Sequence, residues 1–380
     1  MSASARGELA RARSKEYLES DRGAKSALLD EFVAATGVNR KTAMRLLNEP
    51  PLIAVRPRGR PKKRYGTDVA AALELLWPLT GYACSKRLAP FLPSLIGMLE
   101  SSRECPFSDS VKAKLCSISP ATCDRLLWPA RKGSRPRGRS LTKPGSLLKA
   151  QIPIRTHADW LEQEPGFFEA DLVHHCGDSS AGQYLHTLTL TDVETGWTEI
   201  AGLVNRSQTT VLTHIQSIRQ RIPFPMKGLD SDSGSEFIND ILFRYCRSEG
   251  IVFTRSRPYK KNDCCRVEQK NWHVVRQNVG YDRFEAEEAC KALNAMYRLL
   301  RLRLNFLQPT LKLVSKERRG AKIHKAYDEA KTPCQRVLEH PCVPQENKRL
   351  LKEQLQTIKP MQLTKDIIRL REELVKLRKS

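Results

Sequence analysis

The sequence MKGLDSDSGSEF, residues 226–237, decides the fold expected of this chain. It joins a short strand at residues 226–229 to a turn rich in Asp, Ser and Gly, and a helical segment follows at residues 235–248. A strand that ends in a polar turn before a helix is typical of an α/β sheet. The acidic residues of the turn are therefore expected at the carboxyl edge of the sheet.

Further strands and helices are expected on both sides of this stretch. Their order, three strands and then alternating helices and strands, predicts a mixed five-stranded sheet with helices on both faces. Strands are expected at residues 167–173, 184–191, 197–204 and 251–254, and helices at residues 207–222 and 264–277.

The overall charge points to a polyanionic partner. The 380 residues include 65 Lys or Arg and 42 Asp or Glu, for a formal net charge of +23. Such an excess favours nucleic acid as a partner. There is no apolar run long enough to span a membrane and no secretory leader, so a cytoplasmic, nucleoid-associated bacterial protein is expected. The 11 scattered cysteines include no C-x-x-C pair, which favours reduced thiols.

The positive charge is interrupted once. Residues 1–64 hold 15 basic and 7 acidic residues, and residues 129–150 hold 7 basic and none acidic. Residues 167–240 reverse the sign, with 4 basic and 10 acidic residues. Acidic residues inside a polyanion-binding chain would repel the ligand unless cations neutralise them, so bound divalent metal ions are one interpretation. A solvated acidic surface is the alternative.

Three carboxylates stand out by position. Asp171 lies in the first strand, Asp232 follows the fourth strand, and Glu268 opens the helix after the fifth strand. If the first and fourth strands are neighbours, all three side chains can meet and hold two Mg²⁺ or Mn²⁺ ions, which prefer oxygen ligands. Three other residues are weaker candidates: Asp192 and Asp263 fit turn or loop positions, and Asp230 fits the sequence pattern that follows less well than Asp232 does.

These residues resemble a known motif. Asp232-Ser233-Gly234-Ser235-Glu236-Phe237 is similar to the D-[N/H/S]-G-x-E-F motif of retroviral-integrase-like DDE transposases, and 35 residues separate Asp232 from Glu268, as in that family. The runs at 261–263 and 267–272 resemble the sequence around the family's Glu in bacterial insertion-sequence transposases. Ser233 replaces the commoner Asn, and Cys264-Cys265 replaces more usual polar residues.

The resemblance implies an RNase H-like catalytic core in which Asp171, Asp232 and Glu268 are the catalytic residues and the ligands of two Mg²⁺ or Mn²⁺ ions. It further implies DNA strand cleavage, then strand transfer through a 3′-hydroxyl into target DNA. Because two transposon ends must be joined, a homo-oligomer on double-stranded DNA is expected. The alternatives are a catalytically silent DNA-binding regulator or domesticated transposase, and an RNase H-like nuclease that does not transpose.

The rest of the chain is expected to hold DNA. Residues 1–55 predict a helix-turn-helix unit, with helices at 25–35 and 40–47 and Asn39 as the N-cap of the second. Residues 67–130 predict a second helical DNA-binding unit, in which Pro120 starts the last helix. A basic AT-hook-like linker is expected at 56–66 and a basic linker at 131–150. The core spans 151–306, and a basic region with a terminal helix, which either docks or forms a coiled coil, spans 307–380.

Basic side chains in these parts are the predicted DNA contacts. They are Arg40, Lys41, Arg45, Arg58, Arg60, Lys62, Lys63, Arg135, Arg137, Arg139, Lys261, Lys270 and Arg276. Trp272 is expected in the core rather than stacked on a base, and His273 fits either a DNA contact or a surface position. His174, His175 and Cys176 are not expected to share a metal ion, because neighbours on a strand point to opposite faces.

Overall fold

The computed structural model describes residues 1–50, 65–131, 164–231, 236–237, 239–255, 270–319 and 322–379. The chain forms two compact units, Met1–Arg64 and Tyr65–Ser380. The segments expected at 67–130, 151–306 and 307–380 all belong to the second unit. No helix within the described ranges has the length and apolar character needed to cross a membrane.

The first unit is a small three-helix bundle. Its apolar side chains, among them Leu29, Phe32 and Leu47, form a separate buried cluster. Gly37 ends the second helix with a left-handed φ of 70°, and Asn39 starts the third by accepting a hydrogen bond from Thr42 N. The two helices and the turn predicted here are therefore present, as α2 (Arg22–Thr36) and α3 (Arg40–Asn48), and a further helix, α1 (Ala3–Glu19), precedes them.

The second unit begins with a helical part. Pro120 starts its last helix, as predicted, and the Ser119 hydroxyl accepts a hydrogen bond from Thr122 N at 3.3 Å. The elements are α4 (Thr67–Leu76), η1 (Pro78–Thr80), α5 (Ser85–Ser101), α6 (Asp109–Cys116) and α7 (Pro120–Arg131). Their buried side chains belong to the same apolar cluster as those of the sheet that follows.

The predicted five-stranded mixed sheet is confirmed. The strand order is β3-β2-β1-β4-β5, with β1, β2 and β3 antiparallel and β4 and β5 parallel to β1. This order makes the first and fourth strands neighbours, as expected. The strands are β1 (Phe167–His174), β2 (His186–Asp192), β3 (Thr198–Leu203), β4 (Gly228–Ser231) and β5 (Val252–Arg255).

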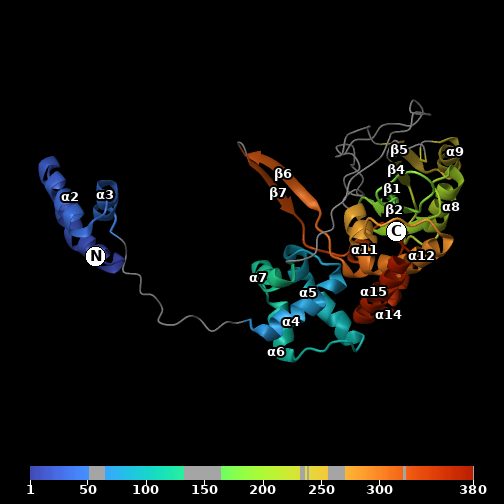
Figure 1. Ribbon diagram of the computed structural model, residues 1–380, viewed down its shortest axis with the longest axis horizontal. Helices are drawn as coiled ribbons and strands as arrows, with labels where there is room; N and C mark the ends of the chain where they lie inside the picture. The colour runs from blue at the N-terminus through green and yellow to red at the C-terminus, as the bar shows by residue number, and fades with distance from the viewer. Residues whose placement is uncertain are drawn as a thin grey trace. The chain divides into compact units, whose positions relative to one another are not determined.

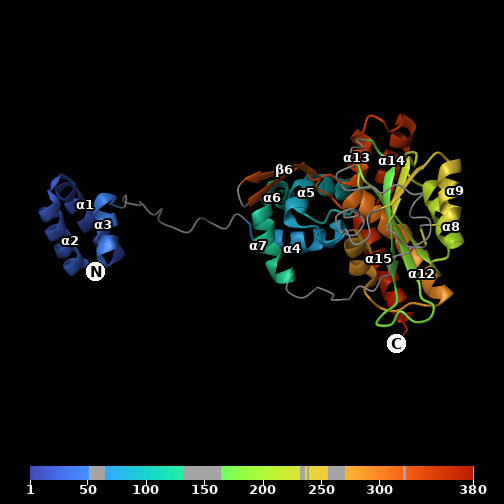
Figure 2. The same cartoon turned by 90° about the horizontal axis from the view of Figure 1, so that it is seen from above.

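Helices cover both faces of this sheet. Figure 2 shows α8 and α9 side by side next to the strands, and α8 and α12 both pack against β3 while α9 packs against β5. Buried Val211, Ile215 and Ile218 recur at helical spacing on α8, so this helix packs on the sheet through one apolar stripe. The helices are α8 (Gln208–Arg219), α9 (Asp240–Ser248), η3 (Asn271–Arg276), α11 (Gln277–Val279), α12 (Glu287–Leu302) and η4 (Arg303–Leu307).

The described part of the helix predicted at 264–277 is not a regular α-helix. Residues Asn271–Arg276 form a π-helical turn rather than an α-helical one. A π turn holds one more residue per hydrogen-bonded ring, and such turns occur often at functional sites.

The C-terminal region contains strands that its basic, polar sequence did not predict. An antiparallel ribbon, β6 (Leu313–Arg319) and β7 (Lys322–Tyr327), precedes α13 (Pro333–Glu339), α14 (Gln345–Thr357) and α15 (Pro360–Lys376). Helix α15 docks on α12 and α5 of the same chain, as Figure 1 also shows for α12. Glu104, just after α5, accepts hydrogen bonds from Met361 N and Gln362 N, so it caps the start of α15.

Candidate active site

Asp171 lies in the middle of the sheet. It is half-buried on β1, opposite Thr189 of β2. Its Oδ1 accepts a hydrogen bond from Leu172 N at 2.8 Å, and its Oδ2 accepts one from Asn271 Nδ2 at 2.5 Å. Two donors on one carboxylate fix its orientation. Asp171 is therefore a preorganised oxygen donor.

Asn271 was missed by the sequence reasoning. It is the first residue of η3 and lies three positions after Glu268 in the chain, which is about one helical turn. That spacing was the available signal. Its amide donates to Asp171, while its Oδ1 is buried without a hydrogen-bond partner. A buried carbonyl oxygen without a donor, next to a carboxylate, fits a divalent cation or a water bound to one.

The other two predicted carboxylates, Asp232 and Glu268, lie outside the described residues. The residues around them are informative. Ala170 pairs with Ser231 in the parallel β1–β4 ladder, and these two immediately precede Asp171 and Asp232 in the chain. In the parts of the chain that the structure describes, no three His, Cys, Asp or Glu side chains group as metal ligands.

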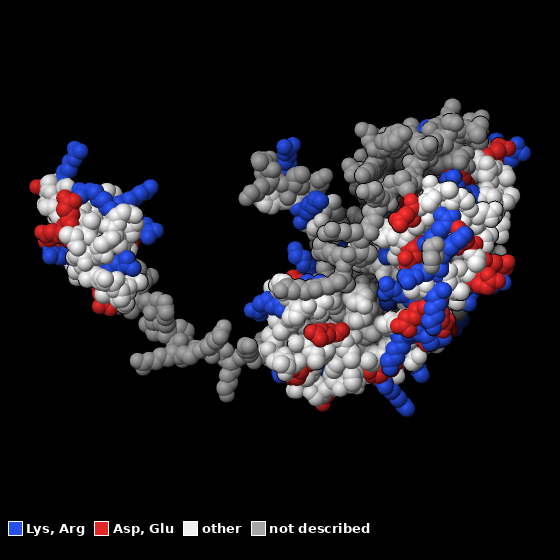
Figure 3. Space-filling model, in the orientation of Figure 1, with Lys and Arg blue, Asp and Glu red and all other residues white. Residues whose placement is uncertain are grey.

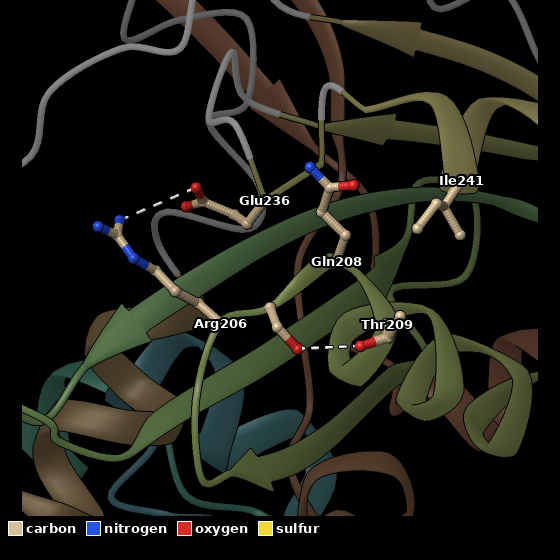
Figure 4. A pocket seen from close by; sticks show the side chains of 6 residues that line it. Arg206, Gln208, Thr209, Glu236 and Ile241 are labelled. Atoms are coloured by element: carbon tan, nitrogen blue, oxygen red, sulfur yellow. Dashed lines mark hydrogen bonds and ion pairs between the residues drawn. The ribbon is translucent and has the colours of Figure 1, made fainter.

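The second half of the quoted motif is anchored by packing. Phe237 is fully buried, and Asn239 accepts a hydrogen bond from Leu242 N to cap α9 while it donates to the Glu236 carbonyl at 2.7 Å. Glu236 pairs with Arg206 at 3.9 Å across a hollow of about 460 Å³ (Figure 4). The hollow is lined by Arg206, Ser207, Gln208, Thr209, Glu236 and Ile241.

Several carboxylates of the acidic stretch have internal partners. Glu199 is fully buried and pairs with Arg221 at 2.8 Å and Arg301 at 2.6 Å. Asp230 accepts a hydrogen bond from Thr254 Oγ1 at 2.5 Å. The reversal of charge in the sequence therefore arises partly from structural ion pairs and hydrogen bonds, and a solvated acidic surface does not describe these groups.

Asp192 is a turn residue, as predicted. Its carboxylate is buried and accepts hydrogen bonds from Gly166 N, Thr195 N and Thr195 Oγ1, each at 2.7 Å. Burial raises the pKa of Asp192 to about 6, and the three donors oppose that rise. These bonds fix the turn between β2 and β3.

The basic residues near Glu268 have internal contacts. Lys270 Nζ lies 3.4 Å from the Gly196 carbonyl, and burial, with Arg87 nearby, lowers the pKa of Lys270 to about 8. Arg276 donates to the carbonyls of His174 and Gly280 and lies over the Tyr281 ring. Their predicted DNA contacts stay predictions.

Trp272 is not in the core. Its side chain is 36% exposed, edge-on to His273, so the expectation of a core position was wrong. A π-helical turn changes which residues of the segment face inward, and the sequence pattern does not reveal that. An exposed ring next to Asn271 is available for contact with a ligand.

The predicted DNA contacts of the first unit lie on α3. Arg40 is tied to α2 by an ion pair with Asp30 and a hydrogen bond to Ser26 Oγ at 2.6 Å. Lys41 and Arg45 are exposed. The other predicted contacts lie outside the described residues: Arg58, Arg60, Lys62, Lys63, Arg135, Arg137, Arg139 and Lys261.

The adjacent histidines have different partners. His174 Nδ1 lies 2.8 Å from His186 Nδ1, while His175 Nε2 lies 2.7 Å from Thr187 Oγ1, which in turn contacts Tyr297 Oη at 2.6 Å. Burial lowers the pKa of both His175 and His186 to about 3. These imidazoles are therefore neutral structural groups at neutral pH.

Comparison with known proteins gives the family. No family model matches the sequence. The uncharacterized protein y4rM of Sinorhizobium fredii strain NGR234 is 40% identical over 331 residues, which cover 86% of this chain and 93% of y4rM. The chain belongs to the y4rM family.

A solved structure matches part of this y4rM family member. It is the catalytic core domain of BIV integrase, with a TM-score of 0.29 and 19% identity, covering 37% of the chain and 83% of that domain. Because y4rM is itself uncharacterized, the function of this family member has to be inferred from its own residues.

Proposed function

We propose that the chain is a metal-dependent DDE transposase that cuts DNA at transposon ends and joins the freed 3′-hydroxyl to target DNA. The observation that carries this proposal is the environment of Asp171, whose carboxylate is held by Asn271, while the amide oxygen of Asn271 is buried without a donor. The β1–β4 register supports it, because Ala170 pairs with Ser231, and these residues immediately precede Asp171 and Asp232 in the chain. The resemblance of 232–237 to the DDE motif supplies the reaction class.

The proposed ligands of two Mg²⁺ or Mn²⁺ ions are Asp171, Asp232 and Glu268. When bound, these ions would polarise the phosphodiester and lower the pKa of the attacking water. The protein's part is to orient the carboxylates: Asn271 and Leu172 N donate to Asp171 and fix the direction in which its oxygens point.

The bonds made and broken are those of phosphoryl transfer. In cleavage, a water oxygen bonds to phosphorus, the bond from phosphorus to O3′ breaks, and O3′ gains a proton to become the 3′-hydroxyl. In strand transfer, this 3′-hydroxyl loses its proton and bonds to a target phosphorus, and the target O3′ leaves. Two DNA ends must meet in the reaction, so we also propose a homo-oligomer on double-stranded DNA.

The first prediction tests the triad. Asp171→Asn and Glu268→Gln each remove a negative oxygen ligand, so Mg²⁺-dependent nicking of a labelled duplex that carries a terminal inverted repeat should fall at least 100-fold. Binding of the same duplex should stay within about twofold of wild type, since neither change removes a positive charge.

Asp178→Asn is the matched control, because it neutralises an exposed carboxylate on the loop after β1. It should nick at the wild-type rate. Full strand transfer by either triad variant would overturn the assignment. A wild-type protein that binds the duplex but never nicks it would instead favour the silent regulator, and nicking without joining would favour a nuclease.

A further inference from the structure

The β6–β7 ribbon is fixed at its base. Lys312 N and the Arg336 guanidinium both donate to the Asp328 carboxylate at 2.6 Å. Thr310 and Lys331 exchange backbone hydrogen bonds, and Lys312 Nζ pairs with Glu194 of the β2–β3 turn at 2.6 Å. The ribbon is therefore held to the catalytic sheet through its own base.

Beyond its base the ribbon has little to pack against. Figure 1 shows β6 and β7 running out from the body of the second unit as a narrow arm. Each side chain described from Leu313 to Arg318 and from His324 to Tyr327 is exposed, including Val314 at 69%. A two-stranded ribbon that buries neither face gains little stability from packing. We therefore expect the ribbon to contact a partner outside the second unit.

The charge of the ribbon indicates the chemical class of its partner. Residues 313–327 contain five Lys or Arg and one Glu. Figure 3 shows Lys and Arg side chains standing out on this part of the molecule. Lys on exposed strands discourages pairing with a further strand, which argues against another protein chain as the partner. An excess of cationic residues on a narrow arm is complementary to a polyanion.

We propose that the β6–β7 ribbon binds double-stranded DNA by lying in its major groove. The major groove is about 12 Å wide and admits a two-stranded ribbon. Seven residues of β6 span about 23 Å, which is less than one turn of duplex. Arg318 on β6 and Lys325 on β7 would then contact phosphates on the walls of the groove. This inference rests on the proposed function, and it adds a DNA contact that no catalytic residue supplies.

The test compares two double variants of the full chain. Arg318→Gln with Lys325→Gln removes two ribbon charges, and Lys352→Gln with Lys365→Gln removes two exposed charges from α14 and α15. Binding of a 30-base-pair duplex of random sequence is measured by fluorescence anisotropy from 50 to 300 mM salt without Mg²⁺. The ribbon variant should bind at least tenfold more weakly at 100 mM salt, and the slope of log K against log salt should fall by about 1.8.

The other outcomes are decisive. A ribbon variant that binds like the α14–α15 control would overturn the ribbon proposal, and the proposed function would stand if wild type still nicks DNA. A wild-type chain that binds no duplex would overturn both. Loss of self-association by the ribbon variant in sedimentation, with duplex affinity unchanged, would assign the ribbon to contacts between copies of the chain instead.

Discussion

Asn271 is the residue whose removal tests how Asp171 is held. Asn271→Ala removes the 2.5 Å hydrogen bond to Asp171 Oδ2 and so weakens the hold on the orientation of the carboxylate. Partners of metal ligands typically contribute 10- to 100-fold, so the nicking rate at fixed Mg²⁺ should fall by about that factor. The Mg²⁺ concentration for half-maximal rate should rise, which a purely structural role would not cause.

Asn347→Ala is the control for this change. Asn347 lies on α14, and its side-chain amide donates one hydrogen bond, at 2.8 Å, to the Pro223 carbonyl, which the substitution removes. It should leave the Mg²⁺ dependence unchanged. If Asn271→Ala lowered the melting temperature but not the Mg²⁺ affinity, Asn271 would be a packing residue and not a positioning residue.

Replacement of Glu199 tests how much a buried ion network contributes to stability. It is fully buried between Arg221 and Arg301, so Glu199→Gln leaves two guanidinium groups without a counter-charge. Breaking one partner of a buried ion network costs about 3–5 kcal/mol in the free energy of unfolding, measured by urea denaturation. The exposed pair Arg219–Glu249 is the comparison, and Glu249→Gln should cost about 1 kcal/mol or less. Equal effects would contradict this account of the buried network.

At the scale of elements, the start of α3 depends on one side chain. Asn39 Oδ1 accepts the hydrogen bond from Thr42 N at 2.8 Å, so Asn39→Ala should destabilise the first unit by about 1 kcal/mol. When urea unfolding is followed by the helical circular dichroism signal, the midpoint of the transition should move to a lower urea concentration. Asn39→Asp keeps the acceptor and should restore the wild-type transition; if it does not, the cap is not the cause.

The sequence was a good guide to elements with a buried face. Strands β1 to β5 and helix α15 were predicted because their apolar residues recur at the period of a strand or a helix. The ribbon β6–β7 was missed because neither of its faces is buried, so alternation of apolar and polar residues is absent. The π-helical form of η3 was also missed, since it depends on contacts with β1 that no local pattern encodes.

The candidate site was predicted in part for a similar reason. Asp171 was identified from its strand and from a motif that begins 61 positions later, and the structure gives it an internal donor. Asn271 was missed because its role comes from a contact between β1 and η3, which lie 100 positions apart. Glu199 and Asp192 contributed to the acidic stretch, but their buried partners lie on other segments and are visible only in the fold.

At the scale of the whole molecule, stability should depend on pH through buried groups. Burial lowers the pKa of His175 and His186 from 6.5 to about 3. Between these pH values each imidazole binds a proton in the unfolded chain but not in the folded chain. Asp192 acts in the opposite direction. Its pKa is about 6 in the folded chain and 3.8 as the ordinary value, so as the pH falls it binds a proton in the folded chain before it does in the unfolded chain. From these three groups, stability should fall by about 1.4 kcal/mol per pH unit from pH 6 to 4.

Urea unfolding at pH 7, 6, 5 and 4 measures this trend. Asp192→Asn removes the opposing proton, so its loss of stability between pH 6 and 4 should be steeper than that of wild type. A chain that is as stable at pH 4 as at pH 7 would show that the two imidazoles are not neutral in the folded state.

The central place of β1 has a consequence for dynamics. This strand bonds to β2 on one side and to β4 on the other, and Asp171 lies within it. The amide hydrogens of such a strand exchange with solvent only when the whole domain opens, whereas edges and arms open locally. Asp171 is therefore held by the most slowly exchanging part of the fold, and heat should abolish activity and the native sheet in one step.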